Sequence, residues 1–381
     1  MTSVVPLHAG IRGRTAYLYE MECIRGVAIL LVLLFHVYGI SGIRPTNPDF
    51  WLSYIIGGNT GVTLFFMLSG FLLSLPWLRY CLGETESVPQ VRNYAVARVL
   101  RIVPLYWLAV IVSVLLSGSF VVGTKAALFQ FVGFDLFPYS VVWWTLTTEV
   151  QFYLMLPFAW IAFIRPGWTR WLVVGLLLAW LVSYISVFIY PGSEKPIRSY
   201  WLTKSLFGRM PAFLIGIAAA LVYLKLQNPF AANSTLMKRM LATLLCVGAC
   251  LALGWILFEV ISVGEKRAEW AWHIHHSYEA ILWALLTLLL LLTKPFGKRL
   301  LVNRPFAVMG KLSYSLYLNH VPILFFLIYP TKEAMGTEAY IQSSYLYLLP
   351  LAAIFLSLGL AVLTYRFIEL PFLNLKHKIP V

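Results

Sequence analysis

The sequence predicts an all-α, polytopic integral membrane protein with about ten transmembrane helices and both termini in the cytoplasm. Of its 381 residues, 60% are hydrophobic and only 12% are charged, and the mean hydropathy is +0.81. Soluble domains of this length do not have such a composition. Aromatic residues make up 16% of the chain, with 14 Trp and 21 Tyr, which is typical of rings that anchor helices at two membrane interfaces.

Ten apolar stretches are each long enough to cross a bilayer as a helix, which takes about 20 residues. In order, they occupy residues 24–43, 54–78, 102–118, 143–164, 171–190, 206–226, 240–262, 277–293, 306–330 and 344–368. No small-residue cleavage site follows the first stretch, so it is expected to be a retained span. We therefore expect one transmembrane domain over residues 1–381, with cytoplasmic segments at 1–22 and 373–381 and no soluble domain.

An even number of spans places both termini on one side of the membrane, and the distribution of Lys and Arg predicts which side. The N-terminal segment, the loops after even-numbered spans and the C-terminal end carry 18 Lys and Arg, whereas the opposite loops carry 8. This excess predicts that both termini lie in the cytoplasm. The expected location is a bacterial-type cytoplasmic (inner) membrane. Because the basic residues lie in short loops, the net charge of +14 does not indicate nucleic-acid binding.

Arg25 and His36 are the first candidate functional residues, because both lie in the first apolar stretch. Eleven residues apart, they share nearly the same helix face and lie about 16 Å apart along its axis. Charged and titratable groups are costly in hydrocarbon and are functional candidates by default. His36 is a candidate general base, since a buried neutral imidazole can accept a proton from a hydroxyl group. Alternatively, His36 packs against a neighbouring helix and Arg25 extends to the membrane interface.

Glu149 and His320 are expected to share the depth of His36 in the membrane. The fourth span runs inward and the ninth runs outward, which places all three side chains in one band near the middle of the bilayer. Three titratable groups from three helices at one level can form a site. Glu149 could orient His36 or form a structural pair with Arg209. His320 could polarise a reacting carbonyl group, bind a substrate or pack its helix.

Arg98 and Arg101 lie three residues apart at the cytosolic entrance of the third span, so their guanidinium groups project from one helix face. Guanidinium groups are suited to bidentate phosphate binding. Taken by themselves, these residues indicate a cytosolic donor of acyl or phosphoryl groups. The alternative is that both arginines serve only as positive charges that fix the topology.

Five blocks of sequence follow one another in order over nearly the whole chain. They are the Arg25–His36 pair, residues 61–73 (GVTLFFMLSGFLL), residues 98–107 (RVLRIVPLYW), residues 144–154 (WTLTTEVQFYL), and the final pair 313–320 (SYSLYLNH) and 366–372 (RFIELPF). Together they resemble the acyltransferase-3 family of membrane acyltransferases. Many members of that family carry a soluble esterase-like domain, for which we expect no counterpart here.

The resemblance implies an O-acyltransferase that takes an acyl group from cytosolic acyl-CoA, with acetyl-CoA as the expected co-substrate. The implied acceptor is a hydroxyl group of a cell-surface or lipid-linked carbohydrate at the outer face. The catalytic residues would be His36, Glu149 and His320. The residues that bind acyl-CoA would be Arg25, Arg98 and Arg101. No permanently bound cofactor, metal or nucleic acid is expected, and membrane lipid is an expected partner.

Two other functions fit the same intramembrane Arg, His and Glu residues. In a proton-coupled transporter they would line a path for protons or substrate, although the chain shows no internal repeat of the kind that several transporters have. In a scaffold or sensor they would serve folding or assembly. Dependence on CoA distinguishes the enzyme from the transporter, because a transporter needs no thioester.

Three smaller features are interpreted as structural. Residues 270–276, which include three His, are expected to form an aromatic interfacial loop on the outer side and not a metal site. Ser69 and Gly70 are expected to mark a close helix contact and not a nucleophile. Arg366 and Glu369 are expected to pair with each other or to contact the phosphates of the donor.

Overall fold

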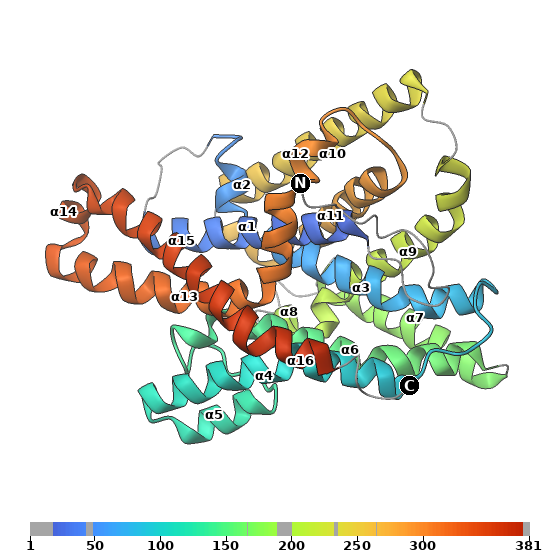
Figure 1. Cartoon of the computed structure of the whole chain (residues 1–381), viewed down its shortest axis with the longest axis horizontal. Helices are drawn as coiled ribbons and strands as arrows, with labels where there is room; N and C mark the ends of the chain where they lie inside the picture. The colour runs from blue at the N-terminus through green and yellow to red at the C-terminus, as the bar shows by residue number, and fades with distance from the viewer. Residues whose placement is uncertain are drawn as a thin grey trace, which may run out of the picture.

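The computed structural model is an all-helical bundle (Figure 1). It describes residues 18–42, 49–165, 167–188, 200–231, 235–263 and 265–375, and none of these ranges contains a β-strand. Most of the cytoplasmic segment predicted at 1–22 and of the tail predicted at 373–381 lies outside the described residues.

Ten of the described helices are long and apolar enough to cross a membrane, which confirms the number predicted from the sequence. They are α1 (Tyr19–Ser41), α3 (Thr60–Cys81), α4 (Val91–Ser117), α6 (Trp143–Ile164), α7 (Trp168–Phe188), α9 (Leu206–Ala231), α10 (Leu236–Val263), α11 (Glu265–Leu292), α13 (Arg304–Met335) and α15 (Tyr345–Thr364). The shorter helices are α2 (Ser53–Ile56), α5 (Phe120–Ala127), α8 (Tyr200–Lys204), α12 (Lys298–Leu301), α14 (Thr337–Gln342) and α16 (Leu370–Leu375). A 3-10 turn, η1 (Tyr139–Val142), precedes α6, and a π-helical turn, η2 (Tyr365–Glu369), follows α15.

Two helices begin well before the predicted spans. α4 starts at Val91 instead of residue 102, and α11 starts at Glu265 instead of residue 277. No Gly or Pro interrupts either extension, so the helix continues beyond the apolar stretch that reveals it in the sequence. Residues 270–276 are therefore helical, and the loop predicted there is wrong. The side chains of residues 270–274 lie outside the described part of the structure.

α1, which carries the first candidate residues, begins and ends at recognisable signals. Glu20 and Glu22 lie in its first turn, where carboxylates interact favourably with the helix dipole. Gly42 follows its last turn with a φ of 77°, a left-handed conformation that favours glycine. Between these ends the helix is mostly apolar, and Arg25 and His36 project from it.

α1 and α13 pack together more extensively than any other pair of helices. Gly26 and Gly310 permit this close approach. A Cβ on Gly26 would lie 2.0 Å from the Phe306 carbonyl oxygen, and one on Gly310 would lie 1.8 Å from that of Glu22. Gly70 lies at a similar crossing of α3 and α9, which confirms the helix contact predicted for it. These crossings fix the helices that carry the candidate site.

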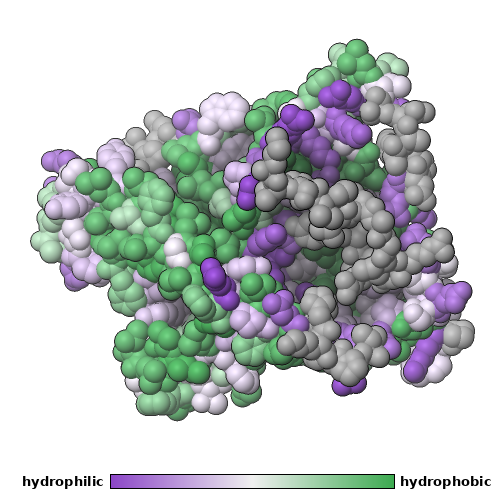
Figure 2. All heavy atoms as spheres, in the orientation of Figure 1, coloured by the Kyte–Doolittle hydropathy of each residue, from purple (hydrophilic) through white to green (hydrophobic). Residues whose placement is uncertain are grey.

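The surface of the bundle is apolar over much of its area, as expected of a protein surrounded by lipid. Large hydrophobic side chains are exposed along α7, α10 and α15. Figure 2 shows hydrophobic residues covering the part of the molecule where α13, α15, α4 and α5 lie in Figure 1. Buried polar residues gather inside instead, on α3, α6, α9, α11 and α13. The bundle interior is therefore where functional groups are to be found.

Candidate functional site

The first cavity of the site has a volume of about 120 Å³ and lies between α1, α3, α4, α6 and α13. We call it the arginine chamber, because Arg25, Arg98 and Arg101 all line it. It occupies the half of the bundle in which α1 begins, on the predicted cytoplasmic side. The structure thus brings together the three arginines that the sequence suggested as ligands of the donor.

Arg98 and Arg101 each have a buried nitrogen without a hydrogen-bond partner among the described residues, whereas Arg25 is paired. Arg25 Nη2 donates a hydrogen bond to Ser313 Oγ at 3.2 Å, and Arg25 Nη1 lies 3.9 Å from Glu22 Oε1. The Arg98 guanidinium lies over the Tyr153 ring, 5.8 Å from its centroid. Arg98 Nε is buried without a hydrogen-bond partner in the described part of the chain. Because buried donors are almost always satisfied, this nitrogen is a candidate ligand for a bound anion.

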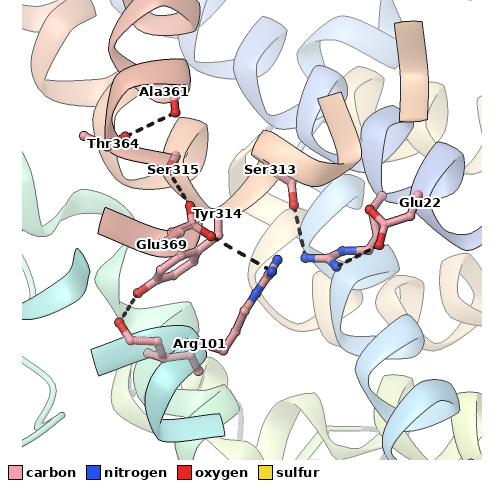
Figure 3. A network of polar contacts seen from close by, with 10 residues as sticks. Glu22, Arg101, Ser313, Tyr314, Ser315, Ala361, Thr364 and Glu369 are labelled. Atoms are coloured by element: carbon pink, nitrogen blue, oxygen red, sulfur yellow. Dashed lines mark hydrogen bonds and ion pairs between the residues drawn. The ribbon is translucent and has the colours of Figure 1, made fainter. Parts of the chain in front are cut away.

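Arg101 is held beside the chamber by a carboxylate from the far end of the chain. Its Nη1 lies 4.0 Å from Glu369 Oε2, and Glu369 accepts a hydrogen bond from the Ser315 hydroxyl (Figure 3). Among the described residues, Arg101 Nη2 has no hydrogen-bond partner although it is buried. Glu369 is buried on η2, whereas Arg366 of the same turn is exposed, so the predicted pair between them does not form. A π-helical turn contains one extra residue, so the side chains that follow it point in a different direction around the helix axis. Such turns are frequent at functional sites.

Glu149 lies in the arginine chamber, where its carboxylate accepts a hydrogen bond from Ser69 Oγ at 2.7 Å. No hydrogen bond or ion pair joins it to His36 or to Arg209, the two partners considered for it from the sequence. Ser69 is therefore a partner of this carboxylate, in addition to lying at a helix crossing. Glu149 offsets part of the positive charge that the arginines bring to the chamber.

The second cavity has a volume of about 160 Å³ and lies in the opposite half of the bundle, toward the end of α1. We call it the histidine chamber, because His36 and His276 line it. Lys204 from α8 and Arg209 from α9 also face this cavity. It therefore combines the candidate base with three further groups that carry, or can carry, positive charge.

His36 and His320 are in direct contact, with His320 Nε2 3.1 Å from His36 Nδ1. His36 Nδ1 also lies 2.9 Å from the Val32 carbonyl oxygen. His320 Nδ1 lies 3.0 Å from the Leu316 carbonyl oxygen. Because a carbonyl oxygen only accepts hydrogen bonds, we assign the hydrogen to Nδ1 in both neutral rings. This tautomer leaves His36 Nε2 unprotonated and able to take a proton from a reactant.

Of the three titratable groups predicted to form one site, the structure brings together His36 and His320 only. His320 is fully buried and lines neither chamber, so it can act on a reactant only through His36. Glu149 belongs to the arginine chamber. The candidate residues are thus divided between two cavities.

The two chambers approach each other at Tyr317 and Val62, which line both. The Tyr317 hydroxyl lies 2.8 Å from Thr145 Oγ1 and 3.2 Å from the Val142 carbonyl oxygen, contacts that fix its ring between the cavities. A layer of side chains therefore separates the arginine chamber from the histidine chamber.

Two residues of the histidine chamber, Lys204 and His276, are not predicted as site residues from the sequence. In the sequence, Lys204 is one of the eight Lys and Arg in the loops on the outer side, and His276 belongs to the predicted loop at residues 270–276. In the structure His276 Nδ1 lies 3.0 Å from Thr63 Oγ1 and 3.4 Å from Glu279 Oε2. The spacing of His276 and Glu279, three residues apart before an apolar stretch, is the signal that could have indicated a shared helix face.

Comparison with known proteins gives a family match over nearly the whole chain. The model of the acyltransferase-3 family, described as an acyltransferase domain, matches residues 18–369. Similar curated proteins include O-acetyltransferase OatA of Staphylococcus aureus, 24% identical, with 93% of this chain and 57% of the relative covered. Peptidoglycan O-acetyltransferase OatA of Listeria monocytogenes is 25% identical, with 93% and 56% covered. The chain thus spans little more than half the length of these relatives. No solved structure matches it significantly.

Proposed function

Because the chain belongs to the acyltransferase-3 family, we propose that it is an integral-membrane O-acyltransferase. The proposed reaction moves an acetyl group from cytosolic acetyl-CoA to a hydroxyl group of a cell-surface or lipid-linked carbohydrate at the outer face. One observation carries the proposal: a chamber lined by three arginines meets, at Tyr317, a chamber lined by His36. The names of the relatives support the acetyl group and, for the Listeria protein, a peptidoglycan acceptor.

The arginine chamber is the proposed entrance for the donor. CoA carries several phosphate groups, and guanidinium groups bind phosphate with two parallel hydrogen bonds. A cavity of about 120 Å³ is too small to enclose CoA. The adenosine end of CoA would therefore remain at the entrance of the cavity, while the long, thin arm that carries the thioester enters it. The offset of about 16 Å between Arg25 and His36 along α1 is of the right order for that arm.

His36 is the proposed general base of a direct transfer. The acceptor oxygen attacks the thioester carbonyl carbon, the C–O bond forms, and the C–S bond breaks. His36 Nε2 takes the proton of the acceptor hydroxyl and returns it to the departing CoA sulfur, so the enzyme ends unchanged. The Nδ1–H of His36 stays directed at Val32 and His320, which keeps Nε2 as the reactive nitrogen.

The test uses inverted membrane vesicles that carry this protein and receive acetyl-CoA with a labelled acetyl group. We expect label in membrane carbohydrate with the unmodified protein, and a rate about 10²–10⁴-fold lower with His36→Ala, the usual contribution of a general base. His275→Ala is the matched control, since His275 lines neither chamber.

Unchanged transfer by His36→Ala would exclude the assigned base. An absence of CoA-dependent transfer with acetyl and longer acyl donors, in vesicles that contain the folded protein and acceptor glycans, would contradict the enzyme and favour the transporter.

A further inference from the structure

The histidine chamber contains more basic groups than proton transfer by His36 requires. Lys204, Arg209 and His276 line it, and none of its described lining residues carries a carboxylate. We propose that this chamber binds an anionic group of the acceptor, a carboxylate or a phosphate, with Arg209 as its principal ligand. The inference rests on the proposed function and adds the chemical class of the acceptor, which is an anionic carbohydrate.

Arg209 is held at the chamber wall without a carboxylate in contact. It is 4% exposed, and its Nε donates a hydrogen bond to the Thr203 carbonyl oxygen at 3.1 Å. Among the described residues, no acidic oxygen lies within 4 Å of its guanidinium nitrogens. Glu279 is near enough for its charge to act on Arg209, but it is engaged by His276 and does not line the cavity. A cation buried in a membrane protein without a contacting acid is costly, and a bound anion would offset that cost.

Trp144 holds two cations against the same wall. Its ring centroid lies 4.1 Å from Lys204 Nζ and 5.1 Å from Arg209 Cζ. Such cation–π contacts orient the basic groups but add no negative charge. The three residues come from α8, α9 and α6, so the arrangement depends on the tertiary fold and not on a local run of basic sequence. An anion in the chamber would interact favourably with both cations at once.

The position of His36 limits where the anionic group can be on the acceptor. His36 and Arg209 line the same cavity of about 160 Å³, which leaves room for little more than one sugar ring. The reacting hydroxyl must reach His36 Nε2 while the anion reaches Arg209. Both groups therefore belong to one sugar or to directly linked neighbours. The planar guanidinium suits either a carboxylate or a phosphate, because both present two oxygens to it.

The experiment compares three sugars of the same ring type by equilibrium dialysis against the purified full chain in detergent. Glucose is neutral, glucuronate carries a carboxylate, and glucose 6-phosphate carries a phosphate. We expect at least one anionic sugar to bind about tenfold more tightly than glucose, the gain typical of a charge-assisted hydrogen bond. The stronger of the two anionic sugars identifies the anion that the chamber prefers.

Variants then assign the preference to the chamber. Arg209→Gln should lose most of the preference for the anionic sugars. Arg209→Lys should keep more of it, because the charge remains although lysine cannot form the two parallel hydrogen bonds of a guanidinium group. Lys125→Gln, which removes an exposed charge of α5 outside the chamber, should keep all of it. Equal binding of the neutral and anionic sugars by the unmodified protein would overturn the proposal, and so would binding of neither anionic sugar. A preference that is undiminished in Arg209→Gln would overturn the assignment to Arg209.

The binding assay contains no acetyl-CoA, so it can fail independently of the proposed transfer reaction. Anion preference without CoA-dependent transfer would leave the anion site in place and remove the acyltransferase assignment. Acetyl transfer without a preference for anionic sugars would leave the acyltransferase assignment in place and remove the anion site. If Arg209 instead stabilises the transition state, Arg209→Gln lowers kcat for every acceptor and sugar binding shows no preference for anions.

Discussion

At the scale of single residues, the site depends on which nitrogen of His36 carries the hydrogen. The Val32 carbonyl oxygen and His320 Nε2 both accept from Nδ1, so the base presents Nε2 to the reactants. His320 does not line either chamber, and its proposed role is to position His36 and to stabilise the imidazolium that forms when the base takes a proton. A mainly structural role for His320 would predict a different pattern of variants.

His320→Leu and His320→Gln separate the two roles. Leucine leaves only the Val32 carbonyl oxygen as an acceptor for His36 Nδ1–H and removes the polar group that stabilises the imidazolium, so we expect kcat to fall about 100-fold with the KM for acetyl-CoA unchanged. Glutamine keeps an acceptor oxygen in reach of that hydrogen, so this variant should retain most of kcat. Steady-state kinetics with acetyl-CoA provide the measurement. Equal losses in both variants, or a loss that follows the amount of folded protein, would favour the structural role.

At the scale of helices, the contact between His36 and His320 is a consequence of how closely α1 and α13 approach. Gly26 and Gly310 allow the backbones of these helices to touch, because each occupies a position where a Cβ would overlap a carbonyl group of the other helix. Backbone atoms cannot move aside as a flexible side chain can. The spacing of α1 and α13 therefore determines the distance between the two imidazole rings.

Gly26→Ala tests this dependence, and Gly39→Ala on the same helix is its control. The added Cβ at Gly26 would lie 2.0 Å from the Phe306 carbonyl oxygen, whereas one at Gly39 would have no neighbour within 4 Å. We expect Gly26→Ala to cost about 1–3 kcal/mol of stability, the usual penalty of overpacking, and to lower the transfer rate. Gly39→Ala should change neither. The unfolding temperature in detergent and the acetyl-transfer rate are the readouts, and identical behaviour of the two variants would contradict the argument.

At the scale of the whole molecule, the proposed reaction depends on the orientation of the bundle in the membrane. Acetyl-CoA is cytosolic, so the arginine chamber must face the cytoplasm and the histidine chamber the outer side. The excess of Lys and Arg in the loops predicts this orientation. It also places the loop after α3 on the cytosolic side and the loop after α5 on the outer side.

Cys81 is a natural probe of that orientation, since it is exposed at the end of α3. A membrane-impermeant maleimide should label it in inverted vesicles and not in intact cells, in a variant from which the other three cysteines have been removed. Asp135→Cys, placed at an exposed position after α5 in a chain without other cysteines, should show the opposite pattern. Labelling of Cys81 in intact cells would reverse the orientation and exclude cytosolic acetyl-CoA as a ligand of the arginine chamber.

The sequence predicted the features that depend on hydropathy and helical spacing. The ten spans follow from their apolar residues, and the meeting of Arg98 and Arg101 follows from their separation by one helical turn. The position of a residue along its helix also predicts its depth in the bilayer, and His36 and His320 are predicted at the same depth for this reason. Depth does not give the direction of a side chain around the helix axis. The sequence therefore predicts Glu149 at the level of His36, with His36 or Arg209 as its partner, and does not predict its place in the arginine chamber beside Ser69.

Other features depend on contacts that no local pattern encodes. Glu369, which pairs with Arg101, lies on the π-helical turn at the end of α15, and the sequence gives no sign of that turn in its composition or periodicity. The histidine chamber gathers Lys204, Arg209 and His276 from three helices, and only packing decides that they face one cavity.

The side chains at Tyr317 that separate the two chambers also bear on how well the protein insulates the membrane. Tyr317 and Val62 line both cavities and lie between the two halves of the bundle. When water fills both cavities, the voltage across the membrane falls mainly over the side chains between them instead of over the full hydrocarbon thickness of about 30 Å. A protein that passes a chemical group between compartments through such a gap must do so without dissipating the ion gradients that the membrane maintains. Tyr317, which its hydrogen bonds hold in place, would then block the passage of ions between the two chambers in addition to its place in the site.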